Sequence, residues 1–151
     1  MKTYKSNLPE ITLSLKKGEQ LKVKIAKSQD AADIFRKIWD KDSIELYESM
    51  ICIFLNRANN TIGWLKVSQG GLDGTIVDNR LILATALNCA AHAIIMAHNH
   101  PSGNTTPSDA DEKITRKLKE AGNIMDIQLL DHIILSGESE EFYSFADNGI
   151  I

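Results

Sequence analysis

The 151-residue sequence predicts a single α/β domain, in which helices flank a mixed β-sheet. Short apolar segments typical of buried strands alternate along the chain with amphipathic helical patterns. The composition, 43% hydrophobic and 25% charged, is that of an ordinary globular protein. No linker, internal repeat or low-complexity segment divides the chain, and its length is enough to bury a sizeable core.

The N-terminal region is predicted to begin with strands. Residues 11–15 and 21–25 alternate apolar and polar side chains, which predicts a β-hairpin or two adjacent strands. The lysines around them are expected to protect a sheet edge rather than to bind a ligand. We assign residues 1–46 to N-terminal strands and a helix, and residues 47–151 to the remainder of the same domain.

A helix and three strands, two of them buried, are predicted next. Ser28 is expected to cap a helix that ends near Asp40 and buries Phe35 and Trp39. Residues 50–55 are apolar on both faces, which is typical of a central strand. A turn and a returning strand at 61–67 follow, and 92–97 is predicted to be a second buried strand.

Two more helices and two strands complete the predicted domain. Asp78 is expected to cap the first helix and Ser108 the second, which Gly122 ends. Strands are expected at 127–135 and 142–145. The predicted apolar faces are Leu83, Leu87, Ala90 and Ala91 in the first helix, and Ala110, Ile114, Leu118 and Ala121 in the second.

Charge and cysteine content narrow the class of protein. The net charge of −3 argues against a dedicated nucleic-acid binder. No apolar run resembles a signal peptide or a membrane span, so we expect a cytoplasmic protein without a membrane partner. In that reducing compartment Cys52 and Cys89 are expected to stay free thiols. The sequence leaves the oligomeric state open.

Residues 98–111 contain the most informative pattern. His98 and His100 stand two apart at the end of a predicted strand, so their side chains share one face. Asp111 lies in the first turn of the next helix, and prolines and a glycine between them can turn the chain back. Two histidines and one carboxylate leave one position open on a tetrahedral zinc ion, which predicts a catalytic Zn²⁺ site.

Simpler explanations exist for each part of this pattern. Ser108 and Asp111 also form the spacing of a capping box, and a carboxylate that caps the helix is turned away from a metal. A nuclease of the His-Asn-His type does not place its three residues consecutively. Cys89 and His92 are spaced like zinc ligands, but one face of a helix end is the more ordinary explanation.

The order His98-Asn99-His100, seven residues, then Ser108-Asp109-Ala110-Asp111 resembles the JAMM/MPN metalloprotease signature. The sequences at 98–103, 107–111 and 131–134 are similar to the RadC-like branch, and the resemblance covers about residues 47–151. It implies a JAB/MPN-like fold, similar to the three-layer fold of the cytidine-deaminase type.

The resemblance also implies roles for individual residues. His98, His100 and Asp111 would hold Zn²⁺, Glu48 would act as general base, and Ser108 would donate to the oxyanion. Glu45 competes with Glu48 for the base position, but lies farther from the strand. The implied enzyme is a zinc metallopeptidase-like hydrolase of an amide or isopeptide bond, with an unidentified peptide or protein substrate.

Two functions other than a zinc-dependent hydrolase remain open. The RadC family name suggests a DNA-repair-associated accessory or nucleic-acid-processing protein. Residues 1–27, however, do not resemble the helix-hairpin-helix region of longer RadC-like proteins, and 77–80 depart from the usual Pro-Arg-Glu sequence. The other is a non-catalytic scaffold.

His132 is either a hydrogen-bonded structural histidine or a contact of the metal ligands.

Overall fold

A computed structural model describes residues 8–12, 22–70 and 77–151. Most of the predicted N-terminal hairpin lies outside these residues, although Lys24 forms a single antiparallel bridge with Asn60. The elements are α1 (Ser28–Ile38), β1 (Ser49–Leu55), β2 (Thr61–Gln69), α2 (Asn79–Asn88), β3 (Ala93–His100), α3 (Asp109–Ile124), β4 (Gln128–Ser136) and β5 (Phe142–Ser144).

The strands form one five-stranded sheet in the order β2-β1-β3-β4-β5. Only β3 and β4 are parallel, and the other neighbouring strands are antiparallel. The mixed sheet of the predicted α/β domain is therefore confirmed. All seven residues of β1 are buried, and so are the first seven residues of β3, as expected for central strands covered on both faces.

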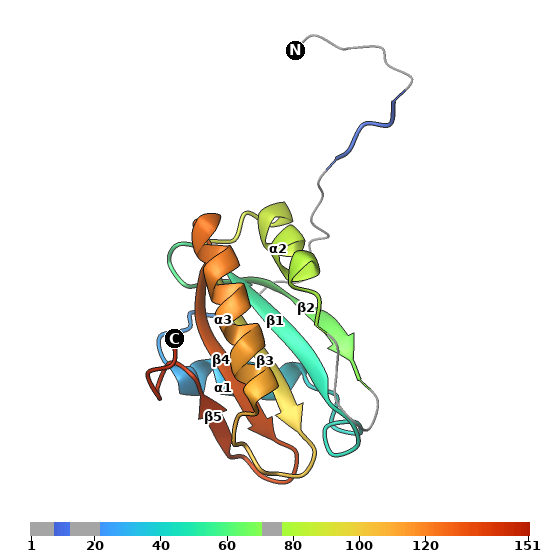
Figure 1. Cartoon of the computed structure of the whole chain (residues 1–151), viewed down its shortest axis with the longest axis vertical. Helices are drawn as coiled ribbons and strands as arrows, with labels where there is room; N and C mark the ends of the chain where they lie inside the picture. The colour runs from blue at the N-terminus through green and yellow to red at the C-terminus, as the bar shows by residue number, and fades with distance from the viewer. Residues whose placement is uncertain (1–7, 13–21, 71–76) are drawn as a thin grey trace.

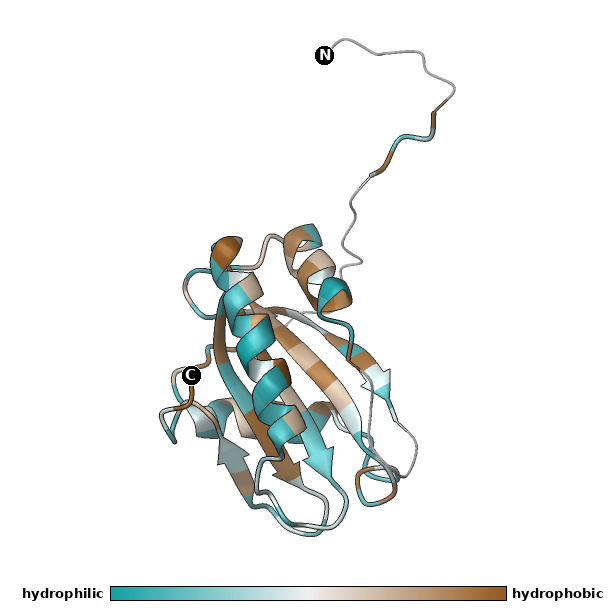
Figure 2. Cartoon of the chain, viewed as in Figure 1, coloured by the Kyte–Doolittle hydropathy of each residue, from teal (hydrophilic) through white to brown (hydrophobic). Residues whose placement is uncertain are grey.

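Helices cover both faces of the sheet. In Figure 1, α2 and α3 lie in front of the strands and α1 lies behind them. Phe35 and Trp39 pack with Ile51, Ile53 and their neighbours on the α1 face. The other face buries one cluster under α2 and α3, which includes Met50, Cys52, Ile82, Ala86, Met96 and Leu118. Figure 2 shows apolar strands beneath an α3 whose outer surface is hydrophilic.

The predicted N-cap of α1 is wrong by one residue. Lys27 occupies the cap position and Ser28 is the first helical residue. Asp30 Oδ2 accepts hydrogen bonds from the backbone N–H groups of Ala26 and Lys27, at 2.9 and 3.1 Å. The first-turn N–H groups of Asp30 and Ala31 lie near the backbone oxygen of Lys27, at 3.1 and 3.4 Å, and the Ser28 hydroxyl donates to Asp147.

The predicted apolar face of α2 is only partly correct, although Asp78 is its N-cap, as expected. Leu83 and Ala91 do pack in the cluster under α2 and α3. The buried residues are Ile82 and Ala86, whereas Leu87 is 50% exposed. The helix ends at Asn88, and Ala90 has a φ of +53°, so Ala90 and Ala91 lie beyond it. The sequence pattern predicted a helix through Ala91, because no glycine or proline marks the left-handed turn at Ala90.

The predicted stripe of α3 is only partly correct. Leu118 is buried, but Ala110 is exposed and Thr115 is buried in its place. Gly122 does not end the helix, which continues to Ile124. A Cβ at Gly122 would lie 2.4 Å from the backbone oxygen of Ile127, so this glycine allows close packing of α3 on the start of β4.

No helix among the described residues is both long and apolar enough to cross a membrane.

Candidate metal centre

The candidate site lies where β3 ends and α3 begins. His98 and His100 are two residues apart on β3, so their side chains share one face of the sheet. His98 pairs across the sheet with Met50, which packs in the cluster under α2 and α3. Both imidazoles therefore lie on the α3 side, next to the first turn that carries Asp111.

The three predicted ligands converge. His98 Nε2 lies 2.9 Å from His100 Nε2 and 3.2 Å from Asp111 Oδ1, and His100 Nε2 lies 3.5 Å from Asp111 Oδ2. Ligand atoms on a tetrahedral zinc ion stand about 3.3 Å apart, given bond lengths of about 2.0–2.1 Å. Within the described part of the chain, this is the one group of such side chains found close enough to hold an ion.

The orientation of the His100 ring is fixed by the loop that follows it. His100 Nδ1 lies 2.6 Å from the backbone oxygen of Asn104. A carbonyl oxygen can only accept, so Nδ1 carries the hydrogen and Nε2 is the atom that faces Asp111. His98 also presents Nε2 to the cluster, because its Nδ1 lies 2.7 Å from His132 Nε2.

Asp111 and His100 each stabilise the charged form of the other. Burial alone would raise the pKa of Asp111, but the contacts with the His100 and His98 imidazoles outweigh it and hold that pKa well below its usual range. The contact with Asp111 in turn raises the pKa of His100, against the opposing effect of burial. Asp111 is therefore an anion at any physiological pH, as a metal ligand must be.

Asp111 caps its helix and faces the histidines at the same time. Its Oδ2 accepts from the Ser108 backbone N–H at 2.8 Å, and Ser108 Oγ accepts from the Asp111 N–H at 3.1 Å. Capping and metal binding therefore do not exclude each other, because Oδ1 remains directed at His98. Ser108 Oγ accepts in this capping box, which leaves the hydroxyl hydrogen available to donate.

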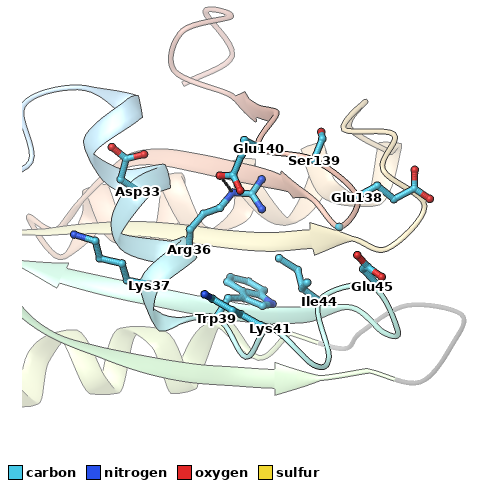
Figure 3. Close-up of a pocket in the computed structure, with 11 residues that line it drawn as sticks. Asp33, Arg36, Lys37, Trp39, Lys41, Ile44, Glu45, Glu138, Ser139 and Glu140 are labelled. Carbon is cyan, nitrogen blue, oxygen red and sulfur yellow. Dashed lines mark ion pairs between the residues drawn. The ribbon is translucent and has the colours of Figure 1, made fainter.

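Glu48 lies beside the cluster rather than within it. It immediately precedes β1, and the pairing of Met50 with His98 in antiparallel register places residue 48 opposite His100. Its negative charge contributes to the raised pKa of His100. Glu45, the competing candidate, instead lines a groove on the α1 side of the sheet together with Trp39 and Glu138 (Figure 3).

Sequence reasoning missed Asn99, whose side chain points to the opposite face. Asn99 is fully buried; its Oδ1 accepts from the Ser49 N–H, and its Nδ2 donates to the backbone oxygens of Ile44 and Tyr47. These partners flank Glu48, so Asn99 anchors the chain on both sides of it. A middle residue of a His-x-His pattern carries no signal of such a role.

His132 contacts a predicted metal ligand and also a neighbouring hydroxyl, so its two expected roles do not exclude each other. Its Nε2 lies 2.7 Å from His98 Nδ1, and its ring stacks on Phe145 with centroids 4.5 Å apart. Burial lowers the pKa of His132 well below its ordinary value, so the ring is neutral. Thr115 contacts its other nitrogen, at 2.6 Å, and was not singled out in the sequence.

The other zinc-like pair is not assembled. His92 is exposed and precedes β3, at the opposite end of that strand from His98 and His100. The partly buried Cys89 thiol instead contacts the backbone oxygen of Ala86 at 3.6 Å. Both cysteines are free thiols, as predicted.

The chain is similar to several known proteins. A family model described as "RadC-like JAB domain" matches residues 25–150. A "UPF0758 protein" of Flavobacterium johnsoniae is 42% identical over 127 residues, which are 84% of this chain and 53% of the relative. Another, from Chlorobium chlorochromatii, is 39% identical over 127 residues, 84% of this chain and 56% of the relative.

A third relative, the "UPF0758 protein YfjY" of Escherichia coli K12, is 40% identical over 104 residues. The match covers 69% of this chain and 64% of that protein. The chain spans about half the length of the first two relatives.

Proposed function

The chain belongs to the RadC-like JAB domain family, and we propose that it is a zinc-dependent hydrolase of the JAMM type that cleaves an amide or isopeptide bond. The observation that carries this proposal is the convergence of His98, His100 and Asp111, with their ligand atoms 2.9–3.5 Å apart. Two imidazole nitrogens and one carboxylate leave a fourth position for water or substrate, as catalytic zinc sites do.

The donor set suits zinc better than other common ions. Imidazole nitrogens are borderline ligands that zinc prefers, whereas magnesium and calcium prefer sites made of oxygen atoms. When bound, zinc supplies a Lewis acid that polarises the scissile carbonyl and acidifies water. His98, His100 and Asp111 would hold it.

Glu48 is the proposed general base. It would take a proton from the attacking water as the carbon–oxygen bond forms, and would give that proton to the leaving amine as the carbon–nitrogen bond breaks. Its location opposite His100, at the edge of the cluster, supports this role. Glu48 is partly buried, so its side chain remains accessible to solvent and to a substrate.

Ser108 is the proposed oxyanion donor. Its Oγ is occupied as an acceptor by the N–H of Asp111, so the hydroxyl hydrogen can point outward. Ser108 is exposed, which allows a substrate carbonyl to approach it. As the carbonyl oxygen gains negative charge, this hydroxyl would stabilise it.

The test compares two glutamates three residues apart. Zinc-loaded full-length protein is incubated with a library of internally quenched peptides and with isopeptide-linked lysine peptides, with and without a chelator. We expect hydrolysis by the wild type, and Glu48→Gln should lower its rate by about 10²–10⁴-fold while retaining zinc. Glu45→Gln is the matched control and should keep the wild-type rate, because Glu45 lines the groove on the other face. A Glu48→Gln protein with the wild-type rate would exclude Glu48 as the base.

The alternative, a DNA-repair-associated accessory protein, stays a prediction. Steeply salt-dependent binding of duplex DNA would support it.

A further inference from the structure

We infer that Thr115 and His132 fix the tautomer of His98, so that its Nε2 lone pair faces Asp111 and His100 before any metal binds. Thr115 and His132 act as positioning residues for His98, one of the three proposed metal ligands. The inference therefore rests on the metal site of the proposed function. It concerns the metal-free protein, so it can be tested without a substrate.

The contacts form one unbroken series across three elements. Thr115 Oγ1 in α3 lies 2.6 Å from the backbone oxygen of Asp111 and 2.6 Å from His132 Nδ1. His132 Nε2 in β4 lies 2.7 Å from His98 Nδ1 in β3. The exposed fractions of Thr115, His132 and His98 are 1%, 0% and 1%, so water does not compete for these contacts.

The directions of the first two hydrogen bonds in the series follow from its first member. The Asp111 carbonyl oxygen can only accept, so the Thr115 hydroxyl must donate its single hydrogen there. Thr115 Oγ1 can then only accept from His132, and His132 Nδ1 carries a hydrogen. The opposite direction would leave two oxygens 2.6 Å apart with no hydrogen between them.

The neutral state of His132 determines the direction of its hydrogen bond with His98. Its ring contacts are Thr115, His98 and Phe145, none of which is an acid, and it is wholly buried. A charge is costly in such surroundings, so His132 Nε2 has no hydrogen and accepts from His98 Nδ1. His98 Nε2 is then left with a lone pair that points at the cluster.

The series connects two ligands of the same site. It begins on the backbone of Asp111 and ends on the ring of His98, so the position of α3 and the tautomer of His98 depend on each other. The other tautomer would direct a hydrogen from Nε2 toward Asp111, and a metal would have to displace it. A ligand whose second nitrogen is held by a neighbour typically loses 10–100-fold in metal affinity when that neighbour is removed.

The direct test is nitrogen NMR of the imidazoles in metal-free, full-length protein. We expect His98 and His132 each to carry a hydrogen on Nδ1 and none on Nε2. A His98 ring with its hydrogen on Nε2 would overturn the inference. The NMR measurement needs neither zinc nor turnover, so failure of the proposed hydrolysis would leave it intact.

The second test removes one hydroxyl. Thr115→Val keeps the shape of the side chain and deprives His132 Nδ1 of its acceptor, so we expect zinc affinity, measured by chelator competition, to fall about 10–100-fold. Thr115→Ser restores the hydroxyl and should bind zinc as the wild type does. Equal zinc affinity in all three proteins would overturn the inference. If Thr115→Val does not fold, the NMR result for the wild type still decides.

Discussion

His98 and His100 are neighbours on one face of one strand, yet different parts of the molecule hold them. His98 is 1% exposed, and a buried side chain of β4 fixes its ring. His100 is only partly buried, and a backbone carbonyl of the loop at 101–107 fixes its ring. The protein core therefore positions one histidine of this centre, and a surface loop positions the other. Mutations in the loop should therefore affect metal binding without disturbing the core.

The largest expected effect on zinc binding comes from removing the imidazole ring of His98 or of His100. His98→Ala and His100→Ala should both lose stoichiometric zinc by elemental analysis, because two ligands do not make a stable site. Their effects on the metal-free protein should differ. His98→Ala leaves a cavity and an unpaired His132 Nε2, so denaturant unfolding should show a loss of about 2–4 kcal/mol. His100→Ala should cost no more than about 1 kcal/mol. Equal losses would contradict the division into core and loop.

The next largest effect is expected from a substitution in the loop alone. Gly103 has a φ of +80° and precedes Asn104, whose carbonyl holds His100. Gly103→Ala should strain this turn and weaken zinc binding by about tenfold, as measured by chelator competition. Gly149 is the matched control, because it has a φ of +73° with open space around it, far along the chain from the ligands. Gly149→Ala should carry a similar backbone strain and bind zinc normally. Equal zinc affinities for the two variants would show that the loop does not set His100.

A smaller effect separates the two roles of Ser108. Ser108→Ala removes both the cap and the proposed oxyanion donor, so we expect about 0.5–2 kcal/mol less stability and slower hydrolysis. Ser108→Asp is also a good cap, but its carboxylate can only accept, so thermal unfolding should be close to that of the wild type while hydrolysis stays slow. If Ser108→Asp restored hydrolysis as well as stability, only the capping role would remain.

The smallest effect is a pH dependence on the loop side. The contact with Asp111 raises the pKa of His100 in the metal-free protein. This contact stabilises the fold below the unfolded pKa of about 6.5, and that contribution is lost as pH rises through the higher folded value. Zinc must displace the His100 proton, so its affinity should fall by up to about tenfold per pH unit below the folded pKa. Asp111→Asn should return the His100 pKa, followed by proton NMR, toward its ordinary value.

The sequence predicted what depends on local spacing. The apolar run at 50–55 is a central strand, and so is the run at 92–97 from Ala93 onward. His98, His100 and Asp111 meet as their spacing indicated. Thr115 and Asn99 could not be found this way. Thr115 looks like an ordinary helical residue, and its importance arises only where α3 crosses β4 beside His132. The error in α2 has a similar origin, since the left-handed turn at Ala90 has no local signal.

The most direct test of the metal centre is X-ray absorption at the zinc edge of the zinc-loaded full-length chain. We predict nitrogen and oxygen neighbours at about 2.0–2.2 Å, with the outer-shell scattering of two imidazoles. Cys89→Ser should give the same spectrum, because Cys89 contacts Ala86 rather than the cluster. A sulfur neighbour at about 2.3 Å, or a spectrum with fewer than two imidazoles, would contradict the assignment of His98, His100 and Asp111 as the zinc ligands.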